Sequence, residues 1–141
     1  EALALARVPI FAGIKPQSLK LLAFSSRRVQ FRPGEKLINM GDEGGHAYVI
    51  LAGKVHIVVG DDDDDVLATK SVNELLGELS LLSNTTATAN VIAAENVTAL
   101  EIQKDAFLQL MENDPHMASQ VARVVSDKLV GTLEVLSAAG N

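Results

Sequence analysis

The chain has 141 residues, 48% of them hydrophobic, with no cysteine and a formal net charge of −6 at pH 7. This length suits one domain around a single hydrophobic core, and the hydrophobic content exceeds that of disordered chains. The negative charge argues against nucleic acid as a partner, and the lack of cysteine excludes disulfides and thiolate chemistry while fitting a cytoplasmic location. No apolar run approaches the length of a membrane span, so we expect a soluble domain with no membrane segment in this chain.

The order of the expected elements is helix, strands, helix. Short helices are expected at 2–7 and 18–24, where apolar residues recur at helical spacing next to prolines. Seven short apolar runs with turn residues between them then predict strands, at 29–31, 35–40, 47–51, 55–59, 66–70, 91–94 and 97–102. The connections at 52–54 and 95–96 look like hairpins. Helices return at 104–113 and 115–139, so the pattern indicates an α+β, mainly β protein with an antiparallel barrel or sandwich.

One stretch, residues 72–91, carries the strongest chemical signal. Gly77 lets the backbone turn, and residues 78–82 can then form about one helical turn. The unpaired N–H groups at the start of such a turn point back at the glycine, where they and the helix dipole favour negative charge. This stretch therefore predicts an anion site.

The sequence of that stretch resembles the phosphate-binding cassette of cyclic nucleotide-binding domains, as found in effector domains of the catabolite-activator type. The matching residues are Gly77-Glu78-Leu79-Ser80-Leu81-Leu82, followed after four residues by Ala87-Thr88-Ala89. Three further blocks in family order also match, at 8–11, 34–55 and 104–110. The resemblance implies one domain over 1–141: an N-terminal helical segment (1–27), a double-stranded β-helix or jelly-roll barrel (28–103) with the cassette-like loop at 76–91, and C-terminal helices (104–139).

The resemblance also implies a set of ligand-binding residues for cAMP or cGMP. Glu78 takes the position of the glutamate that accepts a hydrogen bond from the ribose 2′-hydroxyl, although a helix-capping role is the alternative. The backbone amides of Gly77, Leu79 and Ser80 would face the phosphate. Thr88 takes a position where threonine is associated with guanine recognition, next to Ala89; alternatively, the loop hydroxyls satisfy their own backbone.

Ala87 is the departure from the family pattern, because it stands where the family has its phosphate-binding arginine. Removing one partner of a buried charge pair typically costs about 2–5 kcal/mol, or about 1.5 to 3.5 decades of affinity. We therefore expect a regulatory, non-catalytic domain that binds a cyclic nucleotide weakly or not at all, or accepts a less anionic ligand. The alternative is a degenerate domain that serves in oligomerisation or docking without nucleotide.

Other candidate signals favour no enzyme or metal site. The histidines at 46, 56 and 116 show no ligand spacing, which makes a metal-dependent cupin-like enzyme the weakest alternative. The aspartates at 61–65 lack the interleaved glycine of a calcium loop and are expected at a solvated hairpin tip. Neither a Gly-x-Ser-x-Gly elbow nor a phosphate-binding P-loop motif occurs.

The last helix has two interpretations. Its apolar face could cover the pocket as a lid, with Leu129 and Leu133 as candidates. It could also pair with a second copy, because apolar residues follow an alternating spacing of three and four that suits a two-stranded seam. We expect a homodimer through this helix. The resemblance implies that the terminal helices transmit ligand binding to an effector, covalently attached or separate, which would lie outside this chain; the alternative is that there is no effector.

Overall fold

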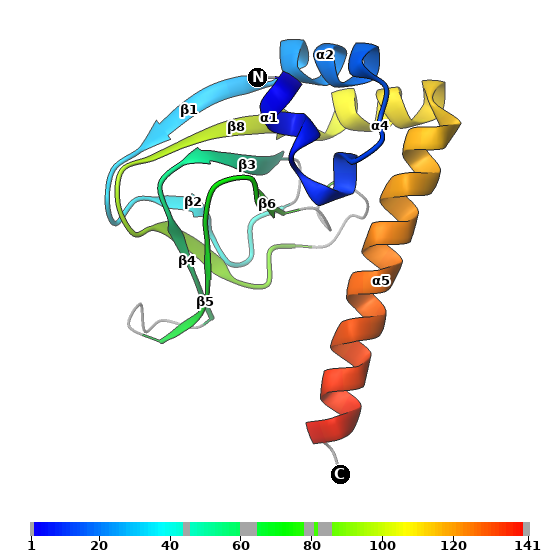
Figure 1. Cartoon of the computed structure of the whole chain (residues 1–141). Helices are drawn as coiled ribbons and strands as arrows, with labels where there is room; N and C mark the ends of the chain where they lie inside the picture. Colours follow the sequence, from blue (N-terminus) through cyan, green and yellow to red (C-terminus); the bar gives the residue numbers. More distant parts are fainter. Residues whose placement is uncertain (1, 44–45, 60–64, 78–80, 82–85, 140–141) are drawn as a thin grey trace.

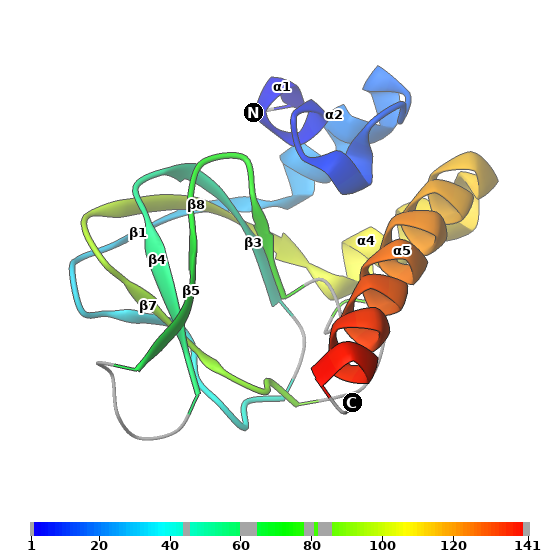
Figure 2. The same cartoon turned by 60° about the horizontal axis from the view of Figure 1, so that its bottom comes forward.

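The computed structural model describes residues 2–43, 46–59, 65–77, 81 and 86–139, and in the last helix it describes side chains only up to residue 127. The described strands form two antiparallel sheets (Figures 1 and 2). The first sheet has the order β1-β8-β3-β6, from β1 (Arg27–Phe31), β8 (Val97–Gln103), β3 (His46–Ala52) and β6 (Leu75–Leu76). The second has the order β2-β7-β4-β5, from β2 (Lys36–Ile38), β7 (Asn90–Ala93), β4 (Val55–Val58) and β5 (Val66–Lys70). The prediction of a mainly β, jelly-roll-like fold is confirmed, with its strands divided between two sheets.

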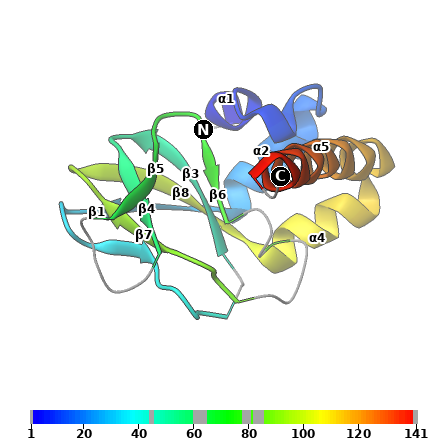
Figure 3. The ribbon, with the colours of Figure 1, turned by 90° about the horizontal axis from the view of Figure 1, so that it is seen from below.

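The helices lie at the two ends of the chain and gather on one side of the strands (Figure 3). Before the strands come α1 (Ala2–Ala6), the short 3-10 helix η1 (Pro9–Phe11) and α2 (Pro16–Ser25). After them come α4 (Lys104–Asn113) and the long helix α5 (Pro115–Ala139). None of the helices in the described part of the chain combines the length and hydropathy needed to cross a bilayer.

The inner part of the first sheet is buried on both faces, which explains the long apolar run of β3, whereas the edge strand β1 is largely exposed. In β3, Ala47 and Val49 pack into a core shared with the helices, through side chains such as Phe11 and Phe107. Tyr48 and Ile50 instead pack into the core between the two sheets. Successive strand residues point to opposite faces, so both faces of β3 need apolar side chains. The molecule therefore has three layers: helices, first sheet and second sheet.

The connections at 52–54 and 95–96 were predicted to be hairpins, and this prediction was wrong. Both are corners at which the chain passes from one sheet to the other. The chain leaves β3 in the first sheet and enters β4 in the second through Gly53, and it returns from β7 to β8 past Asn96. The corners pack on each other, with the Ala94 N–H donating to the Lys54 carbonyl at 2.9 Å. A short polar connection between two apolar runs has the same sequence appearance in a hairpin and in a corner. By contrast, β4 and β5 do pair as a hairpin around residues 60–64, which lie outside the described residues.

Asp114 joins the N-terminal helices to the start of α5. Its Oδ1 accepts a hydrogen bond from the Met117 N–H at 3.1 Å, which is the side-chain cap expected at a helix N-terminus. Its Oδ2 accepts from the Ser18 hydroxyl of α2 at 2.9 Å. These hydrogen bonds, the one from Met117 first, lower the pKa of Asp114 below its ordinary value of 3.8. Ionised Asp114 therefore stabilises the folded chain.

We expect Asp114→Ala to lower the thermal unfolding midpoint at pH 7 by about 2–8 °C, because both the cap and the Ser18 contact are lost. A depressed folded-state pKa stabilises the fold above pH 3.8, and this contribution is lost as pH falls through the folded-state value. The gap between the parent and the variant should therefore shrink in acid. Circular dichroism melts from pH 7 to pH 3 measure it. Asp114→Asn keeps a capping side chain without the charge, so at pH 7 its unfolding midpoint should lie between those of the parent and Asp114→Ala. A gap of constant size at every pH would contradict the ionic contribution.

Candidate functional site

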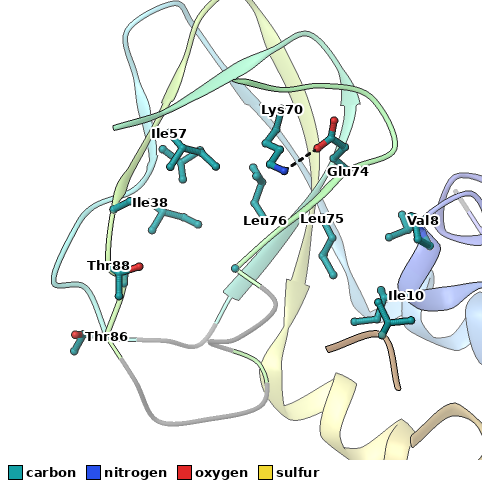
Figure 4. Close-up of a pocket in the computed structure, with 16 residues that line it drawn as sticks. Val8, Ile10, Ile38, Ile57, Lys70, Glu74, Leu75, Leu76, Thr86 and Thr88 are labelled. Atoms are coloured by element: carbon teal, nitrogen blue, oxygen red, sulfur yellow. Dashed lines mark ion pairs between the residues drawn. The ribbon is translucent and has the colours of Figure 1, made fainter. Parts of the chain in front are cut away.

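A cavity of about 530 Å³ lies between the second sheet, the cassette segment and the helices (Figure 4). Its volume is in the range of pockets that hold small organic ligands. The lining comes from six parts of the chain: Val8, Pro9 and Ile10; Ile38; Ile57; Lys70 and Glu74–Gly77; Thr86–Ala89 and Val91; and Val124.

Gly77 forms the part of the wall where β6 ends. Its φ of +81° lies in the left-handed region that side chains other than glycine rarely adopt. A Cβ at this position would lie 3.2 Å from the His46 carbonyl oxygen and 3.5 Å from Cδ1 of Ile38. The bare backbone of Gly77 therefore fits between β3 and the end of β2, and it faces the cavity.

The segment that holds Ala87 is fixed to the turn after β2. The Ala87 N–H donates to the Asp42 carbonyl at 2.9 Å, and the Ala87 carbonyl accepts from the Gly41 N–H at 2.8 Å. Three residues on, the Asn90 side-chain oxygen accepts from the Met40 N–H at 2.7 Å. Because both backbone groups of Ala87 are bonded, this position is set independently of its side chain.

Four of the predicted ligand-binding residues come together at this cavity: Gly77, Ala87, Thr88 and Ala89 all line it. The other three, Glu78, Leu79 and Ser80, lie outside the described residues. The side chains of the lid candidates Leu129 and Leu133 also lie outside the described part of α5. Within that part, α5 reaches the cavity through Val124, one turn or more before those leucines.

Several residues that line the cavity were not among the site residues predicted from the sequence. Val8 and Ile10, from the start of the chain, and Ile38 and Ile57, from the second sheet, supply apolar walls. Their sequence signal is that of any core residue. Lys70 and Glu74 form an ion pair with 3.4 Å between Nζ and Oε2. Among the described lining residues, Lys70 is the sole cation, and it is already paired.

A separate polar cluster is centred on Glu101, which is buried in the first sheet. Its carboxylate accepts hydrogen bonds from the Tyr48 hydroxyl at 3.4 Å and from Nε2 of Gln103 at 3.0 Å. Arg27 lies 3.5 Å away and His46 lies 3.8 Å away. Burial, followed by the charge of Glu101, raises the pKa of Tyr48 to about 12. In the described part of the chain, no group of three metal-ligating side chains is placed to hold a metal ion.

The model of one protein family, described as the cyclic nucleotide-binding domain, matches residues 28–114. The chain belongs to the cyclic nucleotide-binding domain family. The matched residues run from β1 to the end of α4 and include the whole cassette-like loop. Most of the cavity lining falls within the matched residues, and the parts of the lining outside them are Val8, Pro9, Ile10 and Val124.

Several known proteins align with most of this chain. The CRP-like cAMP-activated global transcriptional regulator of Mycobacterium tuberculosis is 28% identical over 127 residues, which are 89% of this chain and 57% of that protein. The N-terminal domain of a transcriptional regulator from Streptomyces coelicolor has a TM-score of 0.78 at 29% identity, covering 94% of this chain and 93% of that one. The regulatory subunit of a cAMP-independent protein kinase A from Trypanosoma brucei has a TM-score of 0.73 at 26% identity, covering 89% and 44%.

A triple-substitution variant of the same T. brucei subunit, one of whose changes introduces an arginine, is described as bound to cAMP and superposes with the same TM-score. This chain spans 57% of the length of the M. tuberculosis regulator.

Proposed function

We propose that this chain is a non-catalytic sensor domain whose cavity takes a cyclic nucleotide with weakened affinity, or takes a less anionic relative of one. The observation that carries the proposal is the cavity itself. It is lined by Gly77 and by Ala87–Ala89, at the place of the family's cassette, yet its described lining offers no unpaired cation. The volume is in the range of pockets for small organic ligands, while the described lining does not offer the positive charge that a phosphate needs.

The missing cation weakens the proposed phosphate site in two ways. A guanidinium at position 87 would donate two parallel hydrogen bonds and neutralise the phosphate charge, and an alanine does neither. Lys70 does not replace it, because Figure 4 shows Lys70 and Glu74 at the far end of the cavity from Thr86 and Thr88, and Glu74 offsets the charge of the Lys70 ammonium. The loss amounts to about 2–5 kcal/mol of binding free energy by analogy with broken buried charge pairs.

The T. brucei relative supports this interpretation. The protein kinase A to which the subunit belongs is named as cAMP-independent, whereas the variant with an introduced arginine is described as bound to cAMP. The contrast fits an arginine that supports cAMP binding on this fold, because a guanidinium can neutralise the phosphate and donate two hydrogen bonds to it. We propose that Ala87 places this chain in the same situation.

The proposed site comprises Gly77, Glu78, Leu79, Ser80, Ala87, Thr88 and Ala89, with Leu129 and Leu133 of α5 as a lid. We propose one domain over 1–141 with the helical segment 1–27, the β region 28–103 and the C-terminal helices 104–139. α5 would pair with a second copy and pass the ligand signal to an effector outside this chain, in the cytoplasm. A ligand can bias such a switch only through its different affinities for the two helix positions.

Isothermal titration calorimetry of the parent chain with cAMP and with cGMP tests the proposal. We expect dissociation constants of about 10 μM or weaker for both, because the backbone cradle remains while the arginine is missing. A dissociation constant below about 1 μM for either nucleotide would contradict the weakened site. If neither the parent nor an Ala87→Arg variant binds, while the chain stays dimeric by light scattering, the chain is the docking module without a ligand.

A further inference from the structure

The ion pair of Lys70 and Glu74 is the one charged feature that the described lining brings into the cavity. Lys70 is the last residue of β5, and its side chain shares a half-buried face with Ala68. The side chains of Lys70 and Glu74 are 40% and 41% exposed, so water or a ligand reaches both. Exposed pairs contribute little to folding, so a change in this pair affects the cavity more than the stability of the fold.

The turn after β5 fixes the position of Glu74. Asn73 has a left-handed φ of 73°, a conformation that asparagine tolerates better than most residues. Its N–H donates to the Ile50 carbonyl at 3.0 Å, and the Ile50 N–H donates to the Glu74 carbonyl at 3.1 Å. The turn is thus bound to β3 of the first sheet by two backbone hydrogen bonds.

The Glu74 carboxylate then fixes Lys70. Oε1 accepts a hydrogen bond from the Ser71 N–H at 3.4 Å, which leaves Oε2 to face the Lys70 ammonium at 3.4 Å. A free lysine side chain would lose about 2 kcal/mol of rotamer entropy on binding a ligand, and a side chain already held in place loses less. An ammonium has three N–H donors, so pairing with one carboxylate oxygen leaves donors for a ligand.

The position of this pair in the cavity suggests which part of a nucleotide it would meet. Figure 4 shows Lys70 and Glu74 at one end, Thr86 and Thr88 at the other, and the apolar side chains of Ile38, Ile57 and Leu76 in the same view. A nucleotide with its phosphate beside residues 86–89 would lay its base against these apolar side chains. The edge of that base would then lie toward Lys70.

We propose that Lys70, held by Glu74, donates hydrogen bonds to the edge of the ligand's base and makes the cavity select guanine over adenine. The inference rests on the proposed function, because it takes a cyclic nucleotide as the ligand. Guanine presents two acceptors on one edge, O6 and N7, which suits a donor such as an ammonium. Adenine presents an N6 amino group in place of O6, and that donor faces the ammonium unfavourably.

The test uses the ratio of cGMP to cAMP affinity, measured by calorimetry in the Ala87→Arg chain and in the parent. Lys70→Met keeps the length and apolar stem of the side chain and removes the charge. We expect this variant to bind cGMP about tenfold more weakly and cAMP less than about twofold more weakly. Lys70→Arg should retain the preference for cGMP. Lys36→Met is the control, since Lys36 is an exposed lysine of the same sheet outside the cavity.

The possible failures are distinguishable. If Lys70→Met lowers the affinity for cGMP and for cAMP equally, Lys70 acts only as a general positive charge, and the proposed selectivity for guanine is overturned. An unchanged ratio in Lys70→Met, with both nucleotides still binding, would overturn the role of Lys70 and leave the proposed function standing. If the Ala87→Arg chain binds neither nucleotide, the proposed function itself is wrong, and this inference falls with it.

Discussion

Replacing Ala87 with arginine is expected to raise the affinity for cyclic nucleotide by about 30- to 3,000-fold, which corresponds to about 2–5 kcal/mol. The substitution supplies the one charge that the cassette lacks, at a position that lines the cavity. The backbone of residue 87 is already held by hydrogen bonds to Asp42 and Gly41, so the new side chain starts from a fixed point. Calorimetric titration of the parent and the variant with the same nucleotide gives the ratio.

Ala87→Gln is the matched control for the arginine variant. Glutamine has a side chain of useful length and hydrogen-bond donors but no charge, so it should recover less than about a tenth of the gain. The affinity of the Ala87→Arg variant for the nucleotide should also fall as the salt concentration increases, since ions screen the new charge. If arginine and glutamine at position 87 give the same affinity, the missing charge does not explain weak binding, and the cavity has diverged in shape as well.

Substituting alanine for Gly53 is expected to destabilise the fold by about 3 kcal/mol or more, enough to unfold much of a marginal domain. Gly53 has a φ of +94°, and a Cβ there would lie 2.3 Å from the Asn96 carbonyl oxygen and 3.0 Å from the Val97 Cα. Both obstacles belong to the backbone of the facing corner, so neither can move aside without separating the corners. Urea unfolding followed by circular dichroism measures the loss.

Gly34→Ala is the control that separates the two causes of this destabilisation, which are the left-handed φ and the close contact with the facing corner. Gly34 also has a left-handed φ, of +88°, but nothing lies within 4 Å of the place where its Cβ would be. This control should cost only the backbone term of about 1–2 kcal/mol. A Gly53→Ala variant no less stable than Gly34→Ala would show that the two corners do not pack as tightly as the structure indicates.

The sequence was sufficient to predict the family and the class of fold, because several signals agreed. The cassette residues Gly77 and Ala87–Ala89 were identified from their own pattern, and the structure brings them together at one cavity. The strand runs were also recognisable, although their ends shifted by a few residues. In β2, for example, pairing covers Lys36–Ile38, not the whole run 35–40.

Two kinds of information could not be predicted from local pattern. The first is which sheet a strand joins: Gly53 and Asn96 have the composition of hairpin turns, and only the packing of one corner on the other makes them corners. The second is the far wall of the cavity. Val8 and Lys70 are separated by most of the first half of the chain, and each has an ordinary local role. Their joint position depends on how η1 and β5 are placed around the sheets.

The most direct test of a weakened cyclic nucleotide site in this cavity is a two-dimensional ¹H–¹⁵N NMR titration of the parent chain with cGMP. We expect amide shifts that grow up to millimolar ligand without saturating at stoichiometric amounts, and that concentrate on Gly77, on residues 86–89 and on Lys70. A spectrum unchanged at several millimolar cGMP and cAMP, or shifts confined to residues away from the cavity, would contradict it.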